Sequence, residues 1–201
     1  MTRMNGKKEH ILSRKNAIRD FTGVSDCGII EGKDGEELEK LYASAERTVA
    51  LLRERKLTLS TAESCTGGLI GKTLTDVPGA SEVFFGGCIT YTNEIKQKLL
   101  GVLPQTLEEH TAVSREVAAQ MCAGAKRALG TDIGVSATGY AGPGGGTDKH
   151  PVGTVFVGIA LPDRTEVREL HFPDCTRAQV RTETVYTLLT WLCSLLTEQA
   201  N

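Results

Sequence analysis

The chain has 201 residues, 40% of them hydrophobic, which suits one domain with a buried core. The formal net charge is −2 and the pI is near 6.1. These values argue against a dedicated nucleic-acid binder, which usually has a strong excess of basic residues. No apolar run is long enough to span a bilayer, and residues 1–8 lack the apolar block of a secretory signal. We therefore expect a cytoplasmic protein without a nucleic-acid or membrane partner.

The cysteines and histidines form no metal-binding pattern. There is no C-x-x-C pair, and the four histidines are not spaced as metal ligands. In a chain without an export signal, scattered cysteines are expected to be reduced thiols, mostly in the core. The six cysteines are Cys27, Cys65, Cys88, Cys122, Cys175 and Cys193. We expect neither a metal ion nor a cofactor.

Residues 1–38 differ from the rest of the chain in being polar and rich in Lys, Arg, Gly and Asp. We interpret them as an N-terminal extension, either a mobile tail or a short helix that lies on the domain. Their basic side chains could instead contact an anionic partner. Residues 39–201 would then form the single functional domain.

Beyond this extension, helical and strand patterns alternate. Apolar residues recur at three- and four-residue steps in the helical segments and form short apolar runs in the strands. The predicted helices are 36–56, 66–74, 93–100, a turn from Pro104, 114–129 and 176–196. The predicted strands are 57–62, 83–91, 132–138, 152–161 and 165–172. The last two strands flank the turn residues 162–164, so we expect them to pair antiparallel.

The ends of these elements carry recognisable signals. Asn93 and Ser114 are predicted N-caps, Gly130 a helix stop, and residues 76–79 a turn. Helices that alternate with strands imply a three-layer α/β/α sandwich, and the late antiparallel pair makes its central sheet mixed but mostly parallel.

The pair Ser64-Cys65 stands where the first strand should end and a helix softened by glycines should begin. In open α/β sheets, ligands bind outside the carboxyl ends of the strands. The segments 91–96 and 139–146 also follow predicted strands, so the three segments could share one crevice.

On pattern alone, a serine at a strand end is more often a helix cap or a partner of the backbone than a nucleophile, so the pattern favours that interpretation for Ser64. It is not in a G-x-S-x-G turn, and no Ser-His-Asp arrangement is compelling. A serine can instead give its proton to a neutral lysine whose pKa is lowered by burial or by a nearby cation. Lys96 is the candidate base and Tyr91 could orient it, although a solvated lysine and an edge tyrosine fit the pattern equally. Cys65 is the rival nucleophile, because a helix N-terminus lowers the pKa of a thiol.

The run Gly142-Pro143-Gly144-Gly145-Gly146 lets backbone N–H groups approach an anion without hindrance from a Cβ atom. It lacks the lysine of an ATP-binding loop and the helix context of a dinucleotide-binding loop. A phosphate cradle and a simple flexible turn both fit it. Arg177 and Arg181, one helical turn apart, could face the same anion or form a solvated basic face.

Five motifs follow one another along the chain. They are 62–68 (AESCTGG), 75–81 (TDVPGAS), 90–96 (TYTNEIK), 112–117 (AVSREV) and 138–143 (TGYAGP). In this order, from about Leu41 to Leu196, the chain resembles the CinA C-terminal domain family, the nicotinamide-nucleotide amidases. Full-length relatives carry an additional N-terminal molybdopterin-binding-like domain, for which this chain has no room, so it resembles the stand-alone form.

The resemblance implies hydrolysis of the carboxamide of nicotinamide mononucleotide to nicotinate mononucleotide and ammonia, a step of NAD salvage. It implies Ser64 as the nucleophile, Lys96 as the general base and Tyr91 as its helper. The implied substrate-binding residues are Thr66, Gly67, Asn93, Gly139, Ala141, Gly142, Gly144, Gly145 and Arg177. Tyr140, His150 and the segment 174–177 depart from the family pattern at the expected ligand rim, which bears on substrate preference.

Other functions remain open on the sequence. A non-catalytic nucleotide-binding module and a hydrolase of a different amide are the main alternatives, and a partner-binding protein that acts through its basic tail is a third. An apolar strand and exposed helix faces favour a homo-oligomer, most simply a homodimer.

Overall fold

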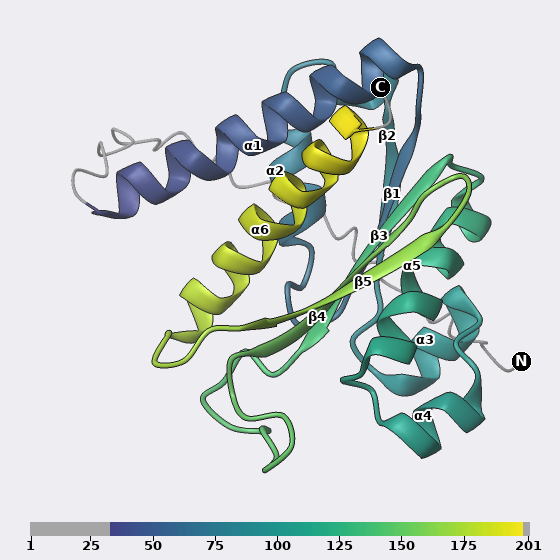
Figure 1. Ribbon diagram of the computed structural model, residues 1–201, viewed down its shortest axis with the longest axis vertical. Helices are drawn as coiled ribbons and strands as arrows, with labels where there is room; N and C mark the ends of the chain where they lie inside the picture. The colour runs from purple at the N-terminus through teal and green to yellow at the C-terminus, as the bar shows by residue number, and fades with distance from the viewer. Residues whose placement is uncertain (1–32, 199–201) are drawn as a thin grey trace, which may run out of the picture. The chain divides into compact units, whose positions relative to one another are not determined.

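The computed structural model describes residues 33–198, so most of the predicted extension lies outside the described residues. Five strands form one sheet in the order β2-β1-β3-β4-β5 (Figure 1). Their bounds are β1 Leu59–Glu63, β2 Phe84–Ile89, β3 Ile133–Gly139, β4 Thr154–Ala160 and β5 Thr165–His171. β1 pairs in parallel with β2 and β3, whereas β4 runs antiparallel to both β3 and β5. Four strands thus point the same way, which confirms the mixed, mostly parallel sheet.

Helices cover both faces of this sheet (Figure 1). One layer holds α1 (Lys33–Arg55), α2 (Leu69–Thr75) and α6 (Arg177–Glu198). The other holds α3 (Asn93–Leu100), α4 (Pro104–His110) and α5 (Arg115–Leu129), and a short 3-10 helix, η1 (Ala80–Glu82), precedes β2. The predicted three-layer α/β/α sandwich is confirmed.

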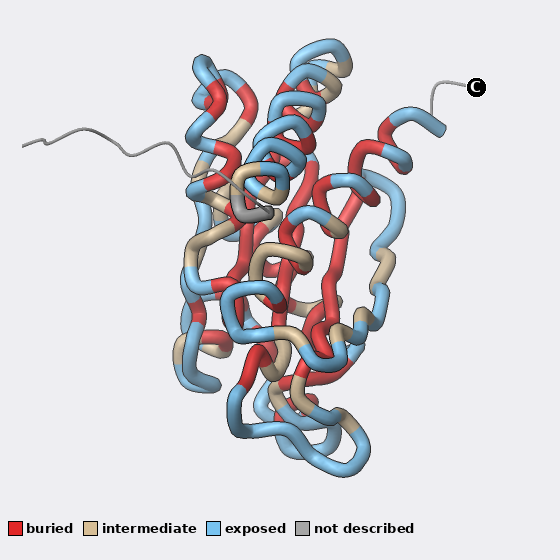
Figure 2. The backbone as a smooth tube through the Cα atoms, turned by 90° about the vertical axis from the view of Figure 1, so that its left-hand side faces the viewer, coloured by how far each residue is buried: buried red, intermediate tan, exposed pale blue. Residues whose placement is uncertain are grey.

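The burial of each strand follows from its place in the sheet (Figure 2). β1 and β4 are buried along their whole length, and β3 up to Gly139, because helices cover both of their faces. The edge strands β2 and β5 contain no fully buried residue. Separate apolar clusters fill the two interlayer spaces, the larger one beneath α1, α2 and α6.

Several predicted helix ends are confirmed, and one is wrong. The Ser114 hydroxyl accepts a hydrogen bond of 3.3 Å from the amide of Val117, and Gly130 closes α5 with a φ of 64°. Asn93 is not the cap of α3. Thr92 takes that position, and its hydroxyl accepts from the amide of Ile95 at 3.4 Å. Thr and Asn are both good cap residues, so the sequence alone does not select between these two neighbours.

The helix predicted over 66–74 begins three residues later, at Leu69. Gly67 and Gly68 have φ values of 58° and 97°, in the left-handed region that a right-handed helix cannot include. Residues 64–68 therefore form a tight turn between β1 and α2, which we call the nucleophile turn, after the role that the family resemblance implies for Ser64. The predicted antiparallel pairing of the last two strands is confirmed.

Within the described residues, no helix combines the length and the apolar character that crossing a bilayer requires.

Candidate active site

Three strand ends meet at one edge of the sheet. Ser64 directly follows β1, Tyr91 lies just after β2, and the 140–146 loop follows β3. These three strands are adjacent and parallel, so their carboxyl ends share the same edge. The structure thus brings together the three segments that the sequence analysis placed at strand ends.

Ser64 and Lys96 lie in contact at this edge. The Nζ atom of Lys96, on α3, is 3.1 Å from the Oγ atom of Ser64 and 2.8 Å from the carbonyl oxygen of Thr90. Lys96 is only 1% exposed and Ser64 9%. A lysine that is buried so completely, with its amine on a serine hydroxyl, matches the geometry of a base and its nucleophile.

Burial lowers the pKa of Lys96, because it removes water that would stabilise the ammonium ion. Nearby Cys65 acts weakly in the opposite direction. The two hydrogen-bond partners of the amine, a hydroxyl and a carbonyl, are both uncharged and do not cancel this effect. A neutral amine can donate to Thr90 and accept the Ser64 hydroxyl proton at the same time.

Cys65 is poorly suited to act as the nucleophile. Its side chain is 6% exposed and packs into the apolar cluster beneath α2 and α6. Burial raises the pKa of Cys65 to about 12, so the thiol keeps its proton at neutral pH. Of the two adjacent candidates, the structure therefore favours Ser64.

Glu63, the last residue of β1, anchors the nucleophile turn, and the sequence analysis missed it. Its carboxylate accepts hydrogen bonds from the amides of Gly68, Ile70 and Gly71 at 2.9, 3.0 and 2.9 Å. The side chain is buried, with 1% exposure. An acidic residue at the end of an otherwise uncharged strand was the available signal.

Two arginines at the start of α6 reach over the same edge. Arg177 donates to the carbonyl of Gly142 at 2.8 Å and to the hydroxyl of Tyr91 at 3.3 Å. Arg181 donates twice to the carbonyl of Thr66, at 3.1 and 2.6 Å. Tyr91 is 63% exposed and points toward Arg177, and no hydrogen bond joins it to Lys96 within the described chain.

The remaining residues that the resemblance implied differ in exposure. Thr66 is fully buried, and its Oγ1 atom has no hydrogen-bond partner in the part of the chain that the structure describes. Gly67, Asn93, Gly144 and Gly145 are exposed, Gly139 is half-buried, and Ala141 and Gly142 are buried.

Tyr140 and His150, which the sequence analysis set apart from the family pattern, lie on the β3–β4 connection. The ring of His150 meets Phe156 edge-on, with centroids 5.2 Å apart, and its Nδ1 atom is 3.6 Å from Glu169. The Tyr140 ring packs beside Gly145, where an added Cβ would lie 3.4 Å from the ring. The Tyr140 side chain thus lies against the glycine run, whereas the His150 side chain contacts β4 and β5.

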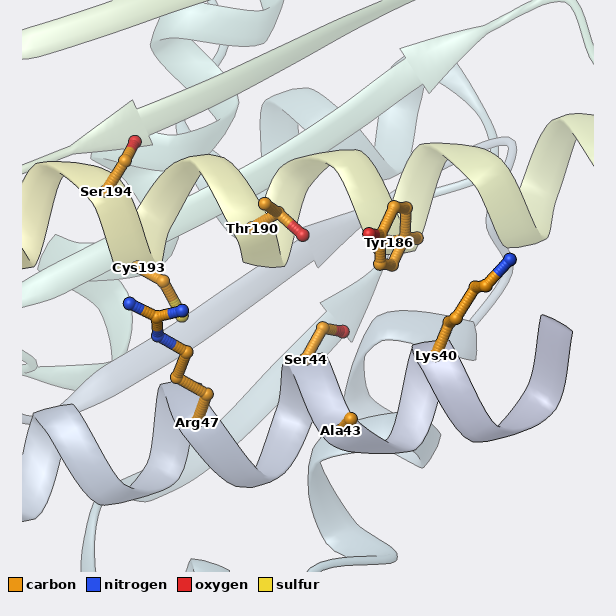
Figure 3. Close-up of a pocket in the computed structure, with 8 residues that line it drawn as sticks. All are labelled: Lys40, Ala43, Ser44, Arg47, Tyr186, Thr190, Cys193 and Ser194. Carbon is orange, nitrogen blue, oxygen red and sulfur yellow. The ribbon is translucent and has the colours of Figure 1, made fainter. Parts of the chain in front are cut away.

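The hollow drawn in Figure 3 lies elsewhere on the molecule. A groove of 360 Å³ between α1 and α6 is lined by residues of these two helices, and Arg47 projects from α1 toward Cys193 (Figure 3). Neither Ser64 nor Lys96 lines this groove.

Across residues 33–198, no three His, Cys, Asp or Glu side chains gather in a group that could hold a metal ion.

The fold and the site together define a class of protein. It is a three-layer α/β/α domain with a buried serine–lysine pair at the end of a strand. Residues 41–196 match the family model described as the CinA C-terminal domain. The chain therefore belongs to the CinA C-terminal domain family.

Curated relatives agree with this assignment. The chain is 49% identical over 160 residues to a CinA-like protein of Chlorobaculum tepidum, an alignment that covers 76% of this chain and 38% of the relative. It is 55% identical over 124 residues to a CinA-like protein of Leptospira borgpetersenii, covering 61% of this chain and 30% of the relative. The chain thus spans less than half the length of these curated relatives.

Solved structures show the same fold. The competence/damage inducible protein CihA of Agrobacterium tumefaciens superposes with a TM-score of 0.75 at 39% identity, over 78% of this chain and 95% of that one. A CinA superfamily protein of Klebsiella pneumoniae gives a TM-score of 0.76 at 30% identity, over 79% and 98% of the two chains.

Proposed function

We propose that this protein is a serine amidohydrolase that converts nicotinamide mononucleotide to nicotinate mononucleotide and ammonia. Family membership supports an amidase-type activity, and the resemblance of the motifs around Ser64, Lys96 and Tyr91 supports this substrate. The observation that carries the proposal is the contact of 3.1 Å between the buried Lys96 amine and the Ser64 hydroxyl.

Acylation begins with proton transfer from Ser64 Oγ to the neutral Lys96 amine, while Oγ attacks the carboxamide carbon. The tetrahedral intermediate then collapses, and the C–N bond breaks as Lys96 returns its proton to the departing nitrogen, which leaves as ammonia. Proton transfer by a positioned side chain contributes about 10²- to 10⁴-fold to a rate.

Deacylation uses the same two residues. A water molecule gives a proton to Lys96 and adds to the ester carbonyl. The bond from the carbonyl carbon to Oγ then breaks, and Lys96 returns the proton to Ser64. The acid product leaves as nicotinate mononucleotide, and the free enzyme is restored.

Backbone amides of the nucleophile turn are suitable donors to the negatively charged oxygen of the tetrahedral intermediate. Neither the Cys65 nor the Thr66 amide donates a backbone hydrogen bond to any described residue. Both directly follow the nucleophile, as an oxyanion donor should. Removing one such donor in other enzymes costs about 10²- to 10³-fold in kcat.

The arginines of α6 favour a substrate with a phosphate. The described residues supply no ion-pair partner for Arg177 or Arg181, whose contacts are with carbonyl and hydroxyl oxygens. Their positive charge is therefore available at the edge of the site, where guanidinium groups bind phosphate in fixed geometry. Tyr91, which contacts Arg177, would line the same rim.

The test is ammonia release from nicotinamide mononucleotide, nicotinamide riboside and NAD by the purified protein. We expect rapid release from the mononucleotide and much slower release from the riboside, which lacks the phosphate. Thermal stabilisation by the mononucleotide without ammonia release would favour a nucleotide-binding module. Release from an unrelated amide alone would favour a hydrolase of different substrate preference.

A further inference from the structure

We infer that Glu63 is a positioning residue of the catalytic site, which holds the nucleophile turn so that Ser64 and the amides after it face the substrate carbonyl. This inference rests on the proposed function, because it assigns Glu63 a part in the same reaction. Glu63 itself would not touch the substrate or exchange a proton with it.

The first support is the way Glu63 satisfies its buried carboxylate. Oε2 accepts from Gly68 and Ile70, and Oε1 accepts from Gly71, each at 2.9 or 3.0 Å. A buried carboxylate without partners is strongly disfavoured, and amides that lack an intrahelical partner are suitable donors to it. The three bonds thus fix the start of α2 relative to the end of β1.

The second support is the shape of the segment that these bonds enclose. Residues 64–67 lie between Glu63 and the first amide that it binds, and the chain reverses there through the left-handed Gly67 and Gly68. Two consecutive glycines give a turn with much freedom in the unfolded chain, so it needs an external anchor to keep one conformation. The Glu63 carboxylate is such an anchor.

The third support is that Glu63 also contacts the strand that leads to the base. Its backbone carbonyl accepts from the Thr90 amide at 2.7 Å, and the Thr90 carbonyl accepts from Lys96 Nζ at 2.8 Å. Glu63 therefore binds the nucleophile turn through its side chain and Thr90, whose carbonyl binds Lys96, through its main chain. A change of the side chain would disturb only the first connection.

Arg181 is a second anchor of the turn. It donates twice to the carbonyl of Thr66, whereas Glu63 accepts amides from Gly68 onward. The amides of Cys65 and Thr66, which directly follow Ser64 in this turn, have no backbone acceptor in the described structure. Under the proposed function they are the candidate donors to the substrate oxygen.

The first experiment compares Glu63→Ala and Glu63→Gln with the wild type in steady-state ammonia release. For Glu63→Ala we expect kcat to fall about 100-fold with little change in KM, because misplacement by about 1 Å costs about that much. Glu63→Gln keeps the shape and one acceptor oxygen, so it should recover part of the loss. The midpoint of the pH dependence of kcat should not change in Glu63→Ala, because the pKa of Lys96 is shifted by burial and by Cys65.

Thr73→Val is the matched control for simple destabilisation of α2. Thr73 is buried on the same helix, and its hydroxyl donates to the Leu69 carbonyl at 2.7 Å without contact to the turn. We expect this variant to keep its kcat. An equal loss of kcat in Thr73→Val, a wild-type kcat in folded Glu63→Ala, or a displaced pH midpoint in Glu63→Ala would each overturn the inference.

A second measurement does not depend on the substrate. A fluorophosphonate probe reacts with an activated serine and uses the same oxyanion donors, and Ser64→Ala provides the blank. Slower labelling of Glu63→Ala than of the wild type supports the inference even if nicotinamide mononucleotide is not hydrolysed, in which case only the proposed substrate is wrong. Equal labelling rates overturn the inference even if the wild type releases ammonia, and a wild type that neither labels nor hydrolyses overturns both.

Discussion

The guanidinium of Arg177 lies 3.3 Å from the hydroxyl of Tyr91, 86 residues earlier in the chain, and 2.8 Å from the carbonyl of Gly142. One side chain of α6 thereby joins the segments that follow β2 and β3. The same edge of the sheet holds Ser64, and under the proposed function the arginine would bind the anionic end of a substrate whose amide reaches the serine.

Arg177→Gln should raise KM for nicotinamide mononucleotide by about 10- to 100-fold. Hydrogen bonds to charged groups are worth about 1.5–3 kcal/mol, and about 1.4 kcal/mol corresponds to a factor of ten. The weaker activity on nicotinamide riboside should not change, since it has no phosphate. Arg164→Gln, on the exposed β4–β5 turn, is the control. An equal effect on both substrates would show that Arg177 does not recognise phosphate.

Cys65→Ala should retain kcat within a few-fold of the wild type. Its thiol is buried with a pKa raised to about 12, and it packs in the core. Truncation of a small buried side chain should lower the free energy of unfolding by about 1 kcal/mol. Ammonia release and thermal unfolding measure the two effects. A loss of kcat as large as that of Ser64→Ala would instead identify Cys65 as the nucleophile.

The lowered pKa of Lys96 predicts a pH-dependent stability. The unfolded chain keeps the lysine proton up to its ordinary pKa of 10.5, whereas the folded protein releases it at lower pH. Between these values the unfolded state binds more protons, so the free energy of unfolding rises with pH. Lys96→Met removes the titrating group, and the wild type should therefore gain stability relative to this variant as pH rises.

Chemical denaturation over a pH series measures this difference. The comparison should be made below pH 9.0, the ordinary pKa of cysteine. Burial raises the pKa of Cys65 and Cys122 in the folded protein, so above pH 9.0 these thiols make the free energy of unfolding fall as pH rises. A difference that stays constant or shrinks as pH rises would mean that Lys96 remains charged in the folded protein.

Gly139→Ala should destabilise the fold, while Gly144→Ala should not. A Cβ at Gly139 would lie 2.6 Å from the Thr154 carbonyl oxygen, where β3 and β4 approach closely. Forced overpacking of this kind costs about 1–3 kcal/mol. At Gly144 an added Cβ meets no described atom within 4 Å. Equal unfolding midpoints for the two variants would show that the close approach is not required.

The order of helices and strands could be predicted because each signal is local. Apolar periodicity predicts a helix from a few neighbouring residues. The structure confirms the predicted cap at Ser114 and the predicted helix end at Gly130. The prediction of Asn93 as a cap was wrong, because Thr92 beside it is also a good cap residue and the sequence does not show at which of the two the helix begins. The late start of α2 depends on two glycine conformations that a helical pattern does not reveal.

The candidate site was only partly accessible to sequence reasoning. Strand ends placed Ser64, the 91–96 segment and the glycine loop at one edge, but the state of Lys96 depends on burial by elements that are distant in the chain. Glu63 escaped notice because its three partners are backbone amides, which carry no signature in the sequence. The choice between Ser64 and Cys65 likewise needed the direction of each side chain.

The most direct test of the central claim is ammonia release from nicotinamide mononucleotide by Ser64→Ala and Lys96→Met, measured beside the wild type. Both variants should be folded, and each should lose at least about 10³-fold in kcat, because loss of either member of a nucleophile–base pair removes nearly the whole effect of the pair. Wild-type activity in either folded variant would contradict a serine–lysine mechanism in this protein.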